Sequence, residues 1–250
     1  MILELTNPHS VLAALKQRPA AVHAVRLPAS GAGPAWEAVT QAARDAGVPV
    51  RKGGPPPESQ RRRRAGAPKQ GREGGACGEV EEREPVSLDV LLQGAKQRDG
   101  GLGLWLAFDL IQDPRNLGAA FRAAAFFGVA GVLLTRDRSA PLTAVSYDTA
   151  SGGMEHVPYS WAANLVGDLK VFKQAGVWVL GAAEEAKSDV HRVARDRPWI
   201  LVIGNEESGL RRLTRQNCDD LCKVTAQGEI GSLNAATATA VLLSALRRPG

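Results

Sequence analysis

The sequence contains few cysteines and few histidines, which limits the disulfide and metal chemistry that it can support. Three cysteines occur among 250 residues, an odd number at unremarkable spacing, which argues against a disulfide scaffold and fits a reducing compartment. Cys218 and Cys222 have the spacing of half a zinc site, but no second Cys or His pair lies near them in the sequence, so we interpret them as buried or partly buried thiols. The histidines also lack metal-ligand spacing: His9, His23, His156 and His191. We therefore predict no metal site.

Long apolar runs and targeting signals are also missing. No apolar run approaches the roughly 18 residues of a membrane-spanning helix. The start, Met1–Leu5, lacks the basic and then apolar segments of a secretory signal peptide, and no transit peptide is visible. We therefore expect a cytoplasmic protein with no membrane partner. A bacterial cytoplasm is the default expectation, and an organelle is the alternative.

Three common enzyme signatures are incomplete. The segment Gly204–Gly209 resembles a phosphate-binding turn but lacks the Lys-Ser/Thr pair of a nucleotide triphosphate-binding loop. Gly103 stands before a predicted strand rather than after it, which argues against a Rossmann dehydrogenase. Serines such as Ser146 and Ser151 lack the Gly-x-Ser-x-Gly context of an α/β-hydrolase. The sequence therefore argues against all three classes.

The net charge of +5 is concentrated in one segment. Residues 51–75 carry eight basic side chains, four of them consecutive at 61–64, and only two acidic ones. A concentrated basic patch in an otherwise nearly neutral chain suggests a polyanionic partner. Because the segment is also rich in proline and glycine, a solvated loop without a binding role is the alternative interpretation.

The first third of the chain predicts a small α/β domain over residues 1–83, with the basic loop at 51–75. The patterns favour helices over Val11–Gln17 and Ala35–Ala46, and strands over Ala21–Leu27, Val48–Val50 and Gly78–Arg83. Residues 84–103 hold a predicted helix over Leu88–Gln97 and a glycine pair at 100–101, which is typical of a linker.

From residue 104 to residue 250, strands alternate with helices, which predicts an α/β domain with a parallel sheet covered by helices on both faces. The predicted strands are Leu104–Leu110, Val129–Thr135, Val177–Gly181, Trp199–Ile203 and Leu221–Thr225. The predicted helices are Leu117–Phe127, Leu142–Ala150, Trp161–Ala175 and 234–246.

The first candidate site segment, Asp113–Arg122, follows a predicted strand and opens a helix. We expect Asn116 to cap this helix and Gly118 to allow a ligand or backbone to approach closely. The predicted buried face of the helix holds Leu117, Phe121 and Ala124. Arg122 lies on a different face among apolar neighbours, so its guanidinium needs a partner. An arginine that snorkels from a core helix is the alternative.

Two more candidate segments follow the last two predicted strands. The turn Gly204–Gly209 contains Glu206, and the final helix begins near Ser232 and Asn234, where simple helix capping is the alternative interpretation. Because the carboxyl ends of parallel strands meet at one edge of a sheet, we expect a carboxylate, a hydroxyl, an amide and backbone N–H groups to converge there in one ligand site.

In this order and spacing, the three segments resemble the SpoU (TrmH-type) RNA ribose 2′-O-methyltransferases of the SPOUT superfamily, from about residue 104 to residue 248. The motifs that carry the resemblance are Asn116-x-Gly118-x-x-x-Arg122, Gly204-x-Glu206-x-x-Gly209-Leu210 and Ser232-Leu233-Asn234-Ala235. Three further segments look like the branch that methylates a guanosine of large-subunit (23S) rRNA: Arg136–Ala140, Ser151–Gly153 and Arg211–Thr214.

Several positions depart from the family pattern. Thr225 stands where the family usually has proline, and Gly231 stands where it usually has serine. The N-terminal unit resembles the family's ribosomal-protein-like RNA-binding domain only in outline. Asn7–Ser10 and Glu73–Gly75 occupy the places of its usual Gly-Ile-His and His-Gln-Gly.

The resemblance implies a C-terminal trefoil knot, S-adenosylmethionine bound within that knot, and a homodimer with the site near the subunit interface. The residues that would line the cofactor pocket by position are Gly204, Gly209, Val224 and Leu233. The implied reaction is methyl transfer to a ribose 2′-hydroxyl without a metal. Arg122 would hold the target's phosphate and stabilise the developing 2′-alkoxide. The residues that would orient Arg122 and the ribose are Asn116, Glu206, Ser232 and Asn234.

Two alternatives stay open at this point. A tRNA guanosine 2′-O-methyltransferase would use the same chemistry, although a separate N-terminal domain favours the rRNA branch. A non-catalytic knotted RNA-binding assembly factor is the alternative from another class, and the departures at Thr225 and Gly231 are its best support.

Overall fold

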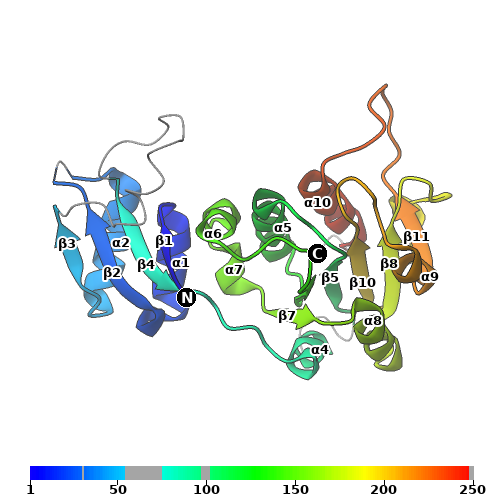
Figure 1. The fold of residues 1–250 in the computed structure, drawn as a ribbon, viewed down its shortest axis with the longest axis horizontal. Coiled ribbons are helices and arrows are strands. Elements are labelled where there is room, and N and C mark those ends of the chain that lie inside the picture. The colour runs from blue at the N-terminus through cyan, green and yellow to red at the C-terminus, as the bar shows by residue number, and fades with distance from the viewer. Residues whose placement is uncertain (30, 54–74, 97–101, 248–250) are drawn as a thin grey trace.

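The computed structural model describes residues 1–29, 31–53, 75–96 and 102–247. Within these ranges the chain forms a four-stranded sheet near the N-terminus and a seven-stranded sheet built from the rest, arranged side by side along the longest axis (Figure 1). The arginine run 61–64, most of the predicted basic loop and the glycine pair 100–101 lie outside the described residues.

The four-stranded sheet has the order β1-β4-β2-β3, in which β4 is antiparallel to both neighbours and β3 is parallel to β2. Its strands are β1 (Ile2–Leu5), β2 (Val22–Leu27), β3 (Val50–Lys52) and β4 (Cys77–Glu81). Two helices, α1 (Pro8–Gln17) and α2 (Pro34–Asp45), accompany it, and a short 3-10 turn spans Pro19–Ala21. The predicted helices and strands are confirmed with shifted ends, whereas β1 was not predicted.

The seven-stranded sheet is parallel throughout and has the order β7-β6-β5-β10-β8-β11-β9. Its strands are β5 (Leu104–Phe108), β6 (Val132–Thr135), β7 (Tyr159–Ala162), β8 (Trp178–Ala182), β9 (Ser188–Asp189), β10 (Trp199–Ile203) and β11 (Asp220–Lys223). The predicted parallel sheet is confirmed. β5 and β10 lie at its centre and are buried along their whole length, as continuous apolar runs require.

Helices cover both faces of this sheet, as predicted. On one face lie α5 (Pro114–Phe126), α6 (Ala144–Ala150), α7 (Gly153–His156) and α10 (Ala235–Leu246), and on the other lie α4 (Leu88–Lys96) and α8 (Leu165–Gln174). The alternation along β5 shows why: Leu106 and Phe108 join the core with α5 and α10, whereas Trp105 and Ala107 join a second core with α4 and α8. A short helix, α9 (Arg212–Gln216), precedes β11.

One helix prediction needs correction here. The predicted helix over Trp161–Ala175 is wrong at its start, because Trp161 belongs to β7, which pairs with β6. The helix α8 begins only after Asn164, whose side chain accepts a hydrogen bond from the Gly167 N–H as an N-cap. The short elements β9, α7 and α9 were also missed, because two to five residues carry too little periodicity to be read.

The small sheet packs on α6 and α7 through polar and apolar contacts. The Asp148 carboxylate accepts hydrogen bonds from the N–H groups of Thr6 and Asn7 and from the Thr6 hydroxyl. Arg18 pairs with the buried Glu155 carboxylate at 2.6 Å. One continuous apolar core joins residues of the small sheet to residues of α6 and α7. The helix α1 therefore packs on α6 and α7, which cover the face of the large sheet that carries α5.

A search of the described ranges finds no helix with both the length and the apolar character needed to span a bilayer.

Candidate functional site

The helix α5 begins earlier than predicted, because Asp113 rather than Asn116 is its N-cap. Asp113 has an extended backbone, its side chain accepts a hydrogen bond from the Arg115 N–H at 2.8 Å, and a proline follows at the first helical position. Asn116 therefore sits inside the first turn, where its amide is available for other contacts. The predicted buried face is confirmed, since Leu117, Phe121 and Ala124 are fully buried.

The structure brings Asn116, Glu206 and Asn234 together, although they are far apart in the sequence. The Asn116 amide donates to the Glu206 carboxylate at 3.1 Å, and the Asn234 amide donates to the Asn116 side-chain oxygen at 2.7 Å. The same chain of hydrogen bonds thus links the first turn of α5, the turn after β10 and the start of α10.

Each end of this chain is fixed by a helix N-terminus. The Glu206 carboxylate also accepts from the backbone N–H groups of Gln112 (3.3 Å) and Asp113 (3.4 Å), just before α5, where a negative charge is favoured by the helix dipole. Asn234 is the N-cap of α10, because its side-chain oxygen accepts from the Thr237 N–H. Capping, the plainer interpretation, is thus correct for Asn234, but its amide nitrogen remains free to bind Asn116.

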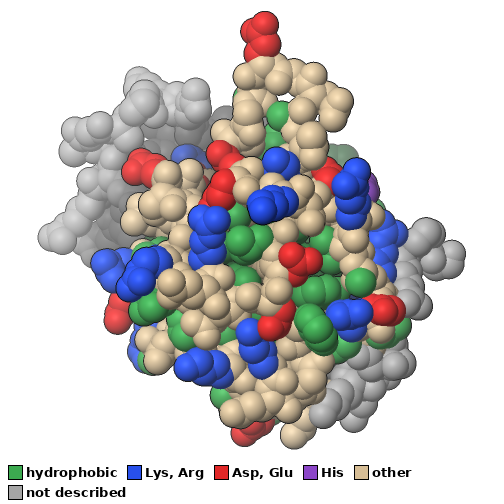
Figure 2. All heavy atoms as spheres, turned by 90° about the vertical axis from the view of Figure 1, so that its right-hand side faces the viewer, with side chains coloured by type: hydrophobic (Ala, Val, Ile, Leu, Met, Phe, Trp, Pro, Cys, Tyr) green, Lys and Arg blue, Asp and Glu red, His purple; other side chains and the backbone are tan. Residues whose placement is uncertain are grey.

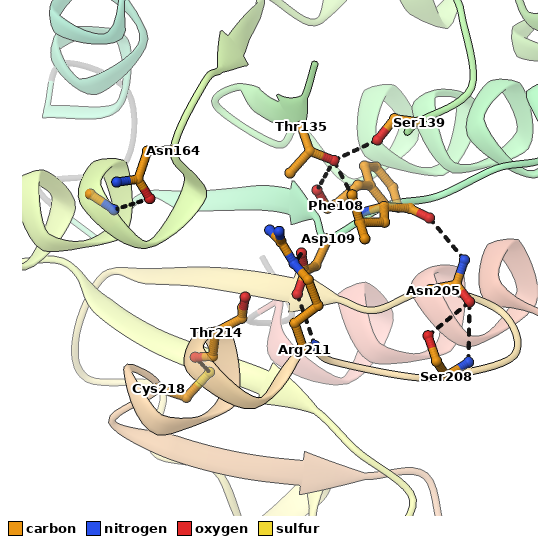
Figure 3. Close-up of polar contacts among 12 residues, drawn as sticks. Phe108, Asp109, Thr135, Ser139, Asn164, Asn205, Ser208, Arg211, Thr214 and Cys218 are labelled. Carbon is orange, nitrogen blue, oxygen red and sulfur yellow. Dashed lines mark hydrogen bonds and ion pairs between the residues drawn. The ribbon is translucent and has the colours of Figure 1, made fainter. Parts of the chain in front are cut away.

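The turn between Gly204 and Gly209 closes on itself. Asn205 and Gly209 exchange two backbone hydrogen bonds of 3.0 Å, and the Asn205 side-chain oxygen accepts from the Glu207 N–H. The same oxygen also accepts from the Ser208 N–H (Figure 3). These N–H groups are therefore already used and do not form a phosphate cradle. A Cβ on Gly204 would lie 2.2 Å from the Gly209 carbonyl carbon, so the turn itself requires glycine there.

A buried carboxylate that the sequence analysis missed anchors this turn. Asp109, at the end of β5, is fully buried and accepts from the Arg211 backbone N–H at 3.0 Å and from its guanidinium at 2.6 Å (Figure 3). Asn205 adds a bond to the backbone oxygen of Leu110, which adopts a left-handed conformation with φ of 69°. An aspartate directly after an apolar strand is a signal that could have identified this site in the sequence.

Arg122 lies apart from these three residues. Its side chain is exposed, and its guanidinium donates to the Ser151 hydroxyl at 3.4 Å, between α6 and α7. Arg122 follows Asn116 by six positions, which rotates it by about 240° around the helix. Among the described residues, no hydrogen bond joins Arg122 to Asn116, Glu206 or Asn234. The sequence predicts a partner for this arginine without identifying it, and in the structure this partner is Ser151.

The segment 225–234 between β11 and α10 is exposed at every position and projects from the body of the molecule (Figures 1 and 2). Leu233 is 48% exposed, whereas Val224, directly before the segment, is partly buried against the core. The Ser232 hydroxyl has no hydrogen-bond partner among the described residues. Within the segment, the backbone N–H groups from 226 to 233 likewise have no partner in the described part of the chain.

Thr225 ties the base of this segment to β9. Its backbone N–H and its hydroxyl both donate to the Asp189 carboxylate, at 3.1 and 2.5 Å. The same carboxylate accepts from the His191 N–H at 2.9 Å. These hydrogen bonds, led by that of the Thr225 hydroxyl, lower the pKa of Asp189 to about 2.

The cysteines are buried or partly buried thiols, as interpreted from the sequence. Burial is the main cause that raises the pKa of Cys77 to about 11 and the pKa values of Cys218 and Cys222 to about 12. Such thiols are protonated and unreactive at neutral pH. In the described ranges, no group of three or more His, Cys, Asp or Glu side chains could hold a metal ion.

Comparison with known proteins shows which family contains this chain. The model of the SpoU rRNA Methylase family matches residues 103–244. The chain belongs to the SpoU rRNA methylase family. All three segments of the hydrogen-bond chain, from α5 to α10, fall within the matched region.

A relative in Ralstonia nicotianae, the 23S rRNA (guanosine-2′-O-)-methyltransferase RlmB, is 40% identical over 158 residues. The aligned part covers 63% of this chain and 62% of that relative, so the chain spans somewhat less than two thirds of its length.

Solved structures share the fold over nearly the whole chain. The SpoU methyltransferase AviRb from Streptomyces viridochromogenes has a TM-score of 0.73 at 21% identity, and the match covers 98% of this chain and 88% of that one. An AdoMet-bound rRNA methyltransferase from Sinorhizobium meliloti also has a TM-score of 0.73 at 21% identity, with 98% and 87% covered. The fold of both sheets is therefore one that this family uses.

Proposed function

We propose that this protein transfers a methyl group from S-adenosylmethionine to the ribose 2′-hydroxyl of a guanosine in 23S rRNA. The observation that carries the proposal is the hydrogen-bond chain of Asn116, Glu206 and Asn234, which joins three segments of the matched family region. The RlmB relative, whose name states this reaction, supports the choice of substrate.

The cofactor proposal uses the two loops that follow β10 and β11. Gly204, Gly209, Val224 and Leu233 would line the pocket, within a trefoil knot formed by the C-terminal part of the chain. The exposed segment 225–234 fits such a role, because its backbone N–H groups from 226 to 233 are not used within the described chain and can bind a polar ligand. When bound, the sulfonium supplies an activated methyl group.

The protein's own residues would bind and align the ribose. The Glu206 carboxylate is held by two backbone N–H groups and by the side-chain amides of Asn116 and Asn205, so its position is fixed before substrate arrives. Asn116, Ser232 and Asn234 would orient the ribose. Correct alignment of the reacting oxygen and methyl group is worth up to roughly 7–11 kcal/mol in ideal cases.

Arg122 would bind the RNA phosphate next to the target and stabilise the negative charge that develops on the 2′-oxygen. Its guanidinium is exposed and can reach RNA, and a guanidinium carries its positive charge at any working pH. It therefore acts by electrostatic stabilisation and positioning rather than as a base.

The remaining parts of the chain would serve RNA binding and assembly. Residues 1–83 would form the RNA-binding domain, 84–103 the linker and 104–250 the catalytic domain, in a cytoplasmic homodimer. Phe126 on α5 is 82% exposed, and beside its neighbour Phe127 lies a shallow hollow that α10 also lines, which favours a second copy of this chain as the occupant.

Two measurements test the proposal. Titration calorimetry should detect S-adenosylmethionine binding, and a protein with no binding would instead be a non-catalytic RNA-binding factor. Transfer of a labelled methyl group should then be measured on 23S rRNA fragments and on purified tRNA. Incorporation into tRNA alone would replace the rRNA assignment with the tRNA alternative.

A further inference from the structure

The turn Ser151–Gly153, between α6 and α7, lies between α5 and the N-terminal unit. This unit, also called the small sheet unit, consists of the four-stranded sheet with α1 and α2. Ser151 and Gly152 both adopt left-handed backbone conformations, with φ of 49° and 92°. A Cβ on Gly152 would lie 2.8 Å from the Ala13 side chain of α1. A Cβ on Gly153 would lie 3.0 Å from the backbone nitrogen of Arg122. The two glycines thus let α1 and α5 approach the turn from opposite sides.

The Ser151 hydroxyl receives a hydrogen bond from each side. The Asn7 amide, at the start of α1, donates to it at 2.9 Å, and the Arg122 guanidinium donates to it at 3.4 Å. A hydroxyl oxygen has two lone pairs, so both are used and the O–H bond must point away from both donors. The hydroxyl cannot rotate freely while Asn7 is in place.

Asn7 is itself held firmly. Its side-chain oxygen caps α1 by accepting from the His9 N–H at 2.9 Å, and its amide nitrogen also donates to the Asp148 backbone oxygen at 2.8 Å. The Asn7 backbone N–H donates to the Asp148 carboxylate at 3.0 Å. The position of the small sheet unit on α6 therefore determines where the Asn7 amide points.

We propose that Ser151, oriented by Asn7, is a positioning residue for the Arg122 guanidinium, so that the docked N-terminal unit sets the direction of the catalytic arginine. The inference rests on the proposed function, in which Arg122 contacts the RNA. Hydrogen bonds at catalytic groups are often long without substrate and shorten in the complex, which suits the 3.4 Å contact. The docked N-terminal unit would then hold the direction of the arginine through one serine.

A pair of variants separates positioning from folding. Ser151→Gly and Ser151→Ala both remove the hydroxyl, but glycine tolerates the left-handed backbone better than alanine does. Both variants should lose about 10-fold to 100-fold in kcat, with KM for S-adenosylmethionine and RNA affinity within about twofold of wild type. The glycine variant should nevertheless melt at or above the wild-type temperature. Thr149→Ala, which removes another hydroxyl from α6, is the matched control and should keep wild-type kcat.

Asn7→Ser tests the link to the small sheet. Serine caps a helix about as well as asparagine but is too short to reach Ser151. The kcat of Asn7→Ser should fall. Combining Asn7→Ser with Ser151→Gly should cause no further loss of kcat, because both changes act through one hydroxyl. Wild-type kcat in the Ser151 variants, additive losses in the double variant, or losses of activity that simply follow melting temperature would overturn the inference.

One readout does not depend on activity. The guanidinium signals of Arg122, identified in ¹⁵N NMR spectra by their loss in Arg122→Lys, should shift or sharpen in Ser151→Gly and in Asn7→Ser. Unchanged signals would overturn the inference. A wild-type protein that methylates no RNA would instead overturn the proposed function, while the NMR comparison would still decide whether Ser151 positions the arginine.

Discussion

The two loops at the carboxyl ends of β10 and β11 are built in opposite ways. The turn 204–211 is held by its own Asn205, by a bond to Leu110 and by the buried Asp109. The segment 225–234 is fixed at its ends, by Thr225 to Asp189 and by Asn234 to Asn116, and is exposed between them. The first loop is complete without a ligand, whereas the second offers unused backbone groups. We expect ligand binding to order the second loop against the first.

The largest expected effect is on turnover in Arg122→Ala, a variant that should leave both loops and cofactor binding unchanged. Arg122→Ala should fold and bind S-adenosylmethionine as wild type does, because no hydrogen bond joins the Arg122 side chain to either loop in the described ranges. Turnover should fall by about 10²–10⁴. The measurements are single-turnover methyl transfer and calorimetric binding of the cofactor. Near wild-type methylation would remove Arg122 from the mechanism.

Loss of the anchor under the first loop should cost the most stability. Arg211→Ala leaves the buried Asp109 carboxylate without its guanidinium partner, although the backbone N–H at position 211 still donates. We expect a loss of about 2–3 kcal/mol in the free energy of unfolding. Urea denaturation at neutral pH measures it, with the exposed neighbour variant Arg212→Ala as the control. Equal stabilities for the two variants would contradict the anchoring role of Asp109.

Glycine substitutions compare the two loops directly. Gly204→Ala places a methyl group 2.2 Å from the Gly209 backbone, and should cost about 1–3 kcal/mol. Gly228→Ala meets nothing within 4 Å and should leave the stability of the free protein almost unchanged. Thermal melting of both variants without cofactor gives the difference. If both variants were equally stable, the first loop would not be the rigid one.

The smallest expected effect concerns the base of the second loop. Thr225→Val removes the hydroxyl hydrogen bond that contributes most to holding the pKa of Asp189 near 2, below its ordinary value of 3.8. The backbone N–H at position 225 can still donate to this carboxylate, so the pKa should rise only part of the way. The pKa of Asp189 is lower in the folded state than its ordinary value of 3.8. The ionised carboxylate therefore stabilises the fold at pH values above 3.8, and this stabilisation is lost as the pH falls towards 2.

Melting temperatures measured from neutral pH down to about pH 2 test this. The wild type should exceed Thr225→Val slightly at neutral pH, and the gap should close as the solution becomes acidic. A gap that stays constant over this range would show that Asp189 is not the partner responsible.

Sequence patterns predicted the fold correctly in long helices with regular apolar spacing and in fully buried strands. β5 and β10 are continuous apolar runs, and α5 presents Leu117, Phe121 and Ala124 at helical spacing. All three elements were therefore identified from the sequence. Trp161 was misassigned because an aromatic residue before a helix fits either state until its pairing with β6 is known. The pairing of β7 with β6 belongs to the tertiary structure, and local periodicity in the sequence does not reveal it.

The candidate site was predicted in part. Asn116, Glu206 and Asn234 carry polar groups at three strand-to-helix turns, and the geometry of a parallel sheet brings such turns to one edge. The bond between Arg122 and Ser151 could not be foreseen, because it depends on two close approaches that the glycines at 152 and 153 permit. The buried Asp109 after β5 was missed, although its place directly after an apolar strand was a signal; its partner Arg211 lies about a hundred positions away, so the sequence alone does not pair them.

The most direct test of the account identifies the methylated atom. The purified protein should be incubated with 23S rRNA and labelled S-adenosylmethionine, and the RNA should then be digested to nucleosides and separated by mass. We expect label in 2′-O-methylguanosine for the wild type and its near loss for Arg122→Ala. Label on a base, or equal 2′-O-methylation by both proteins, would contradict it.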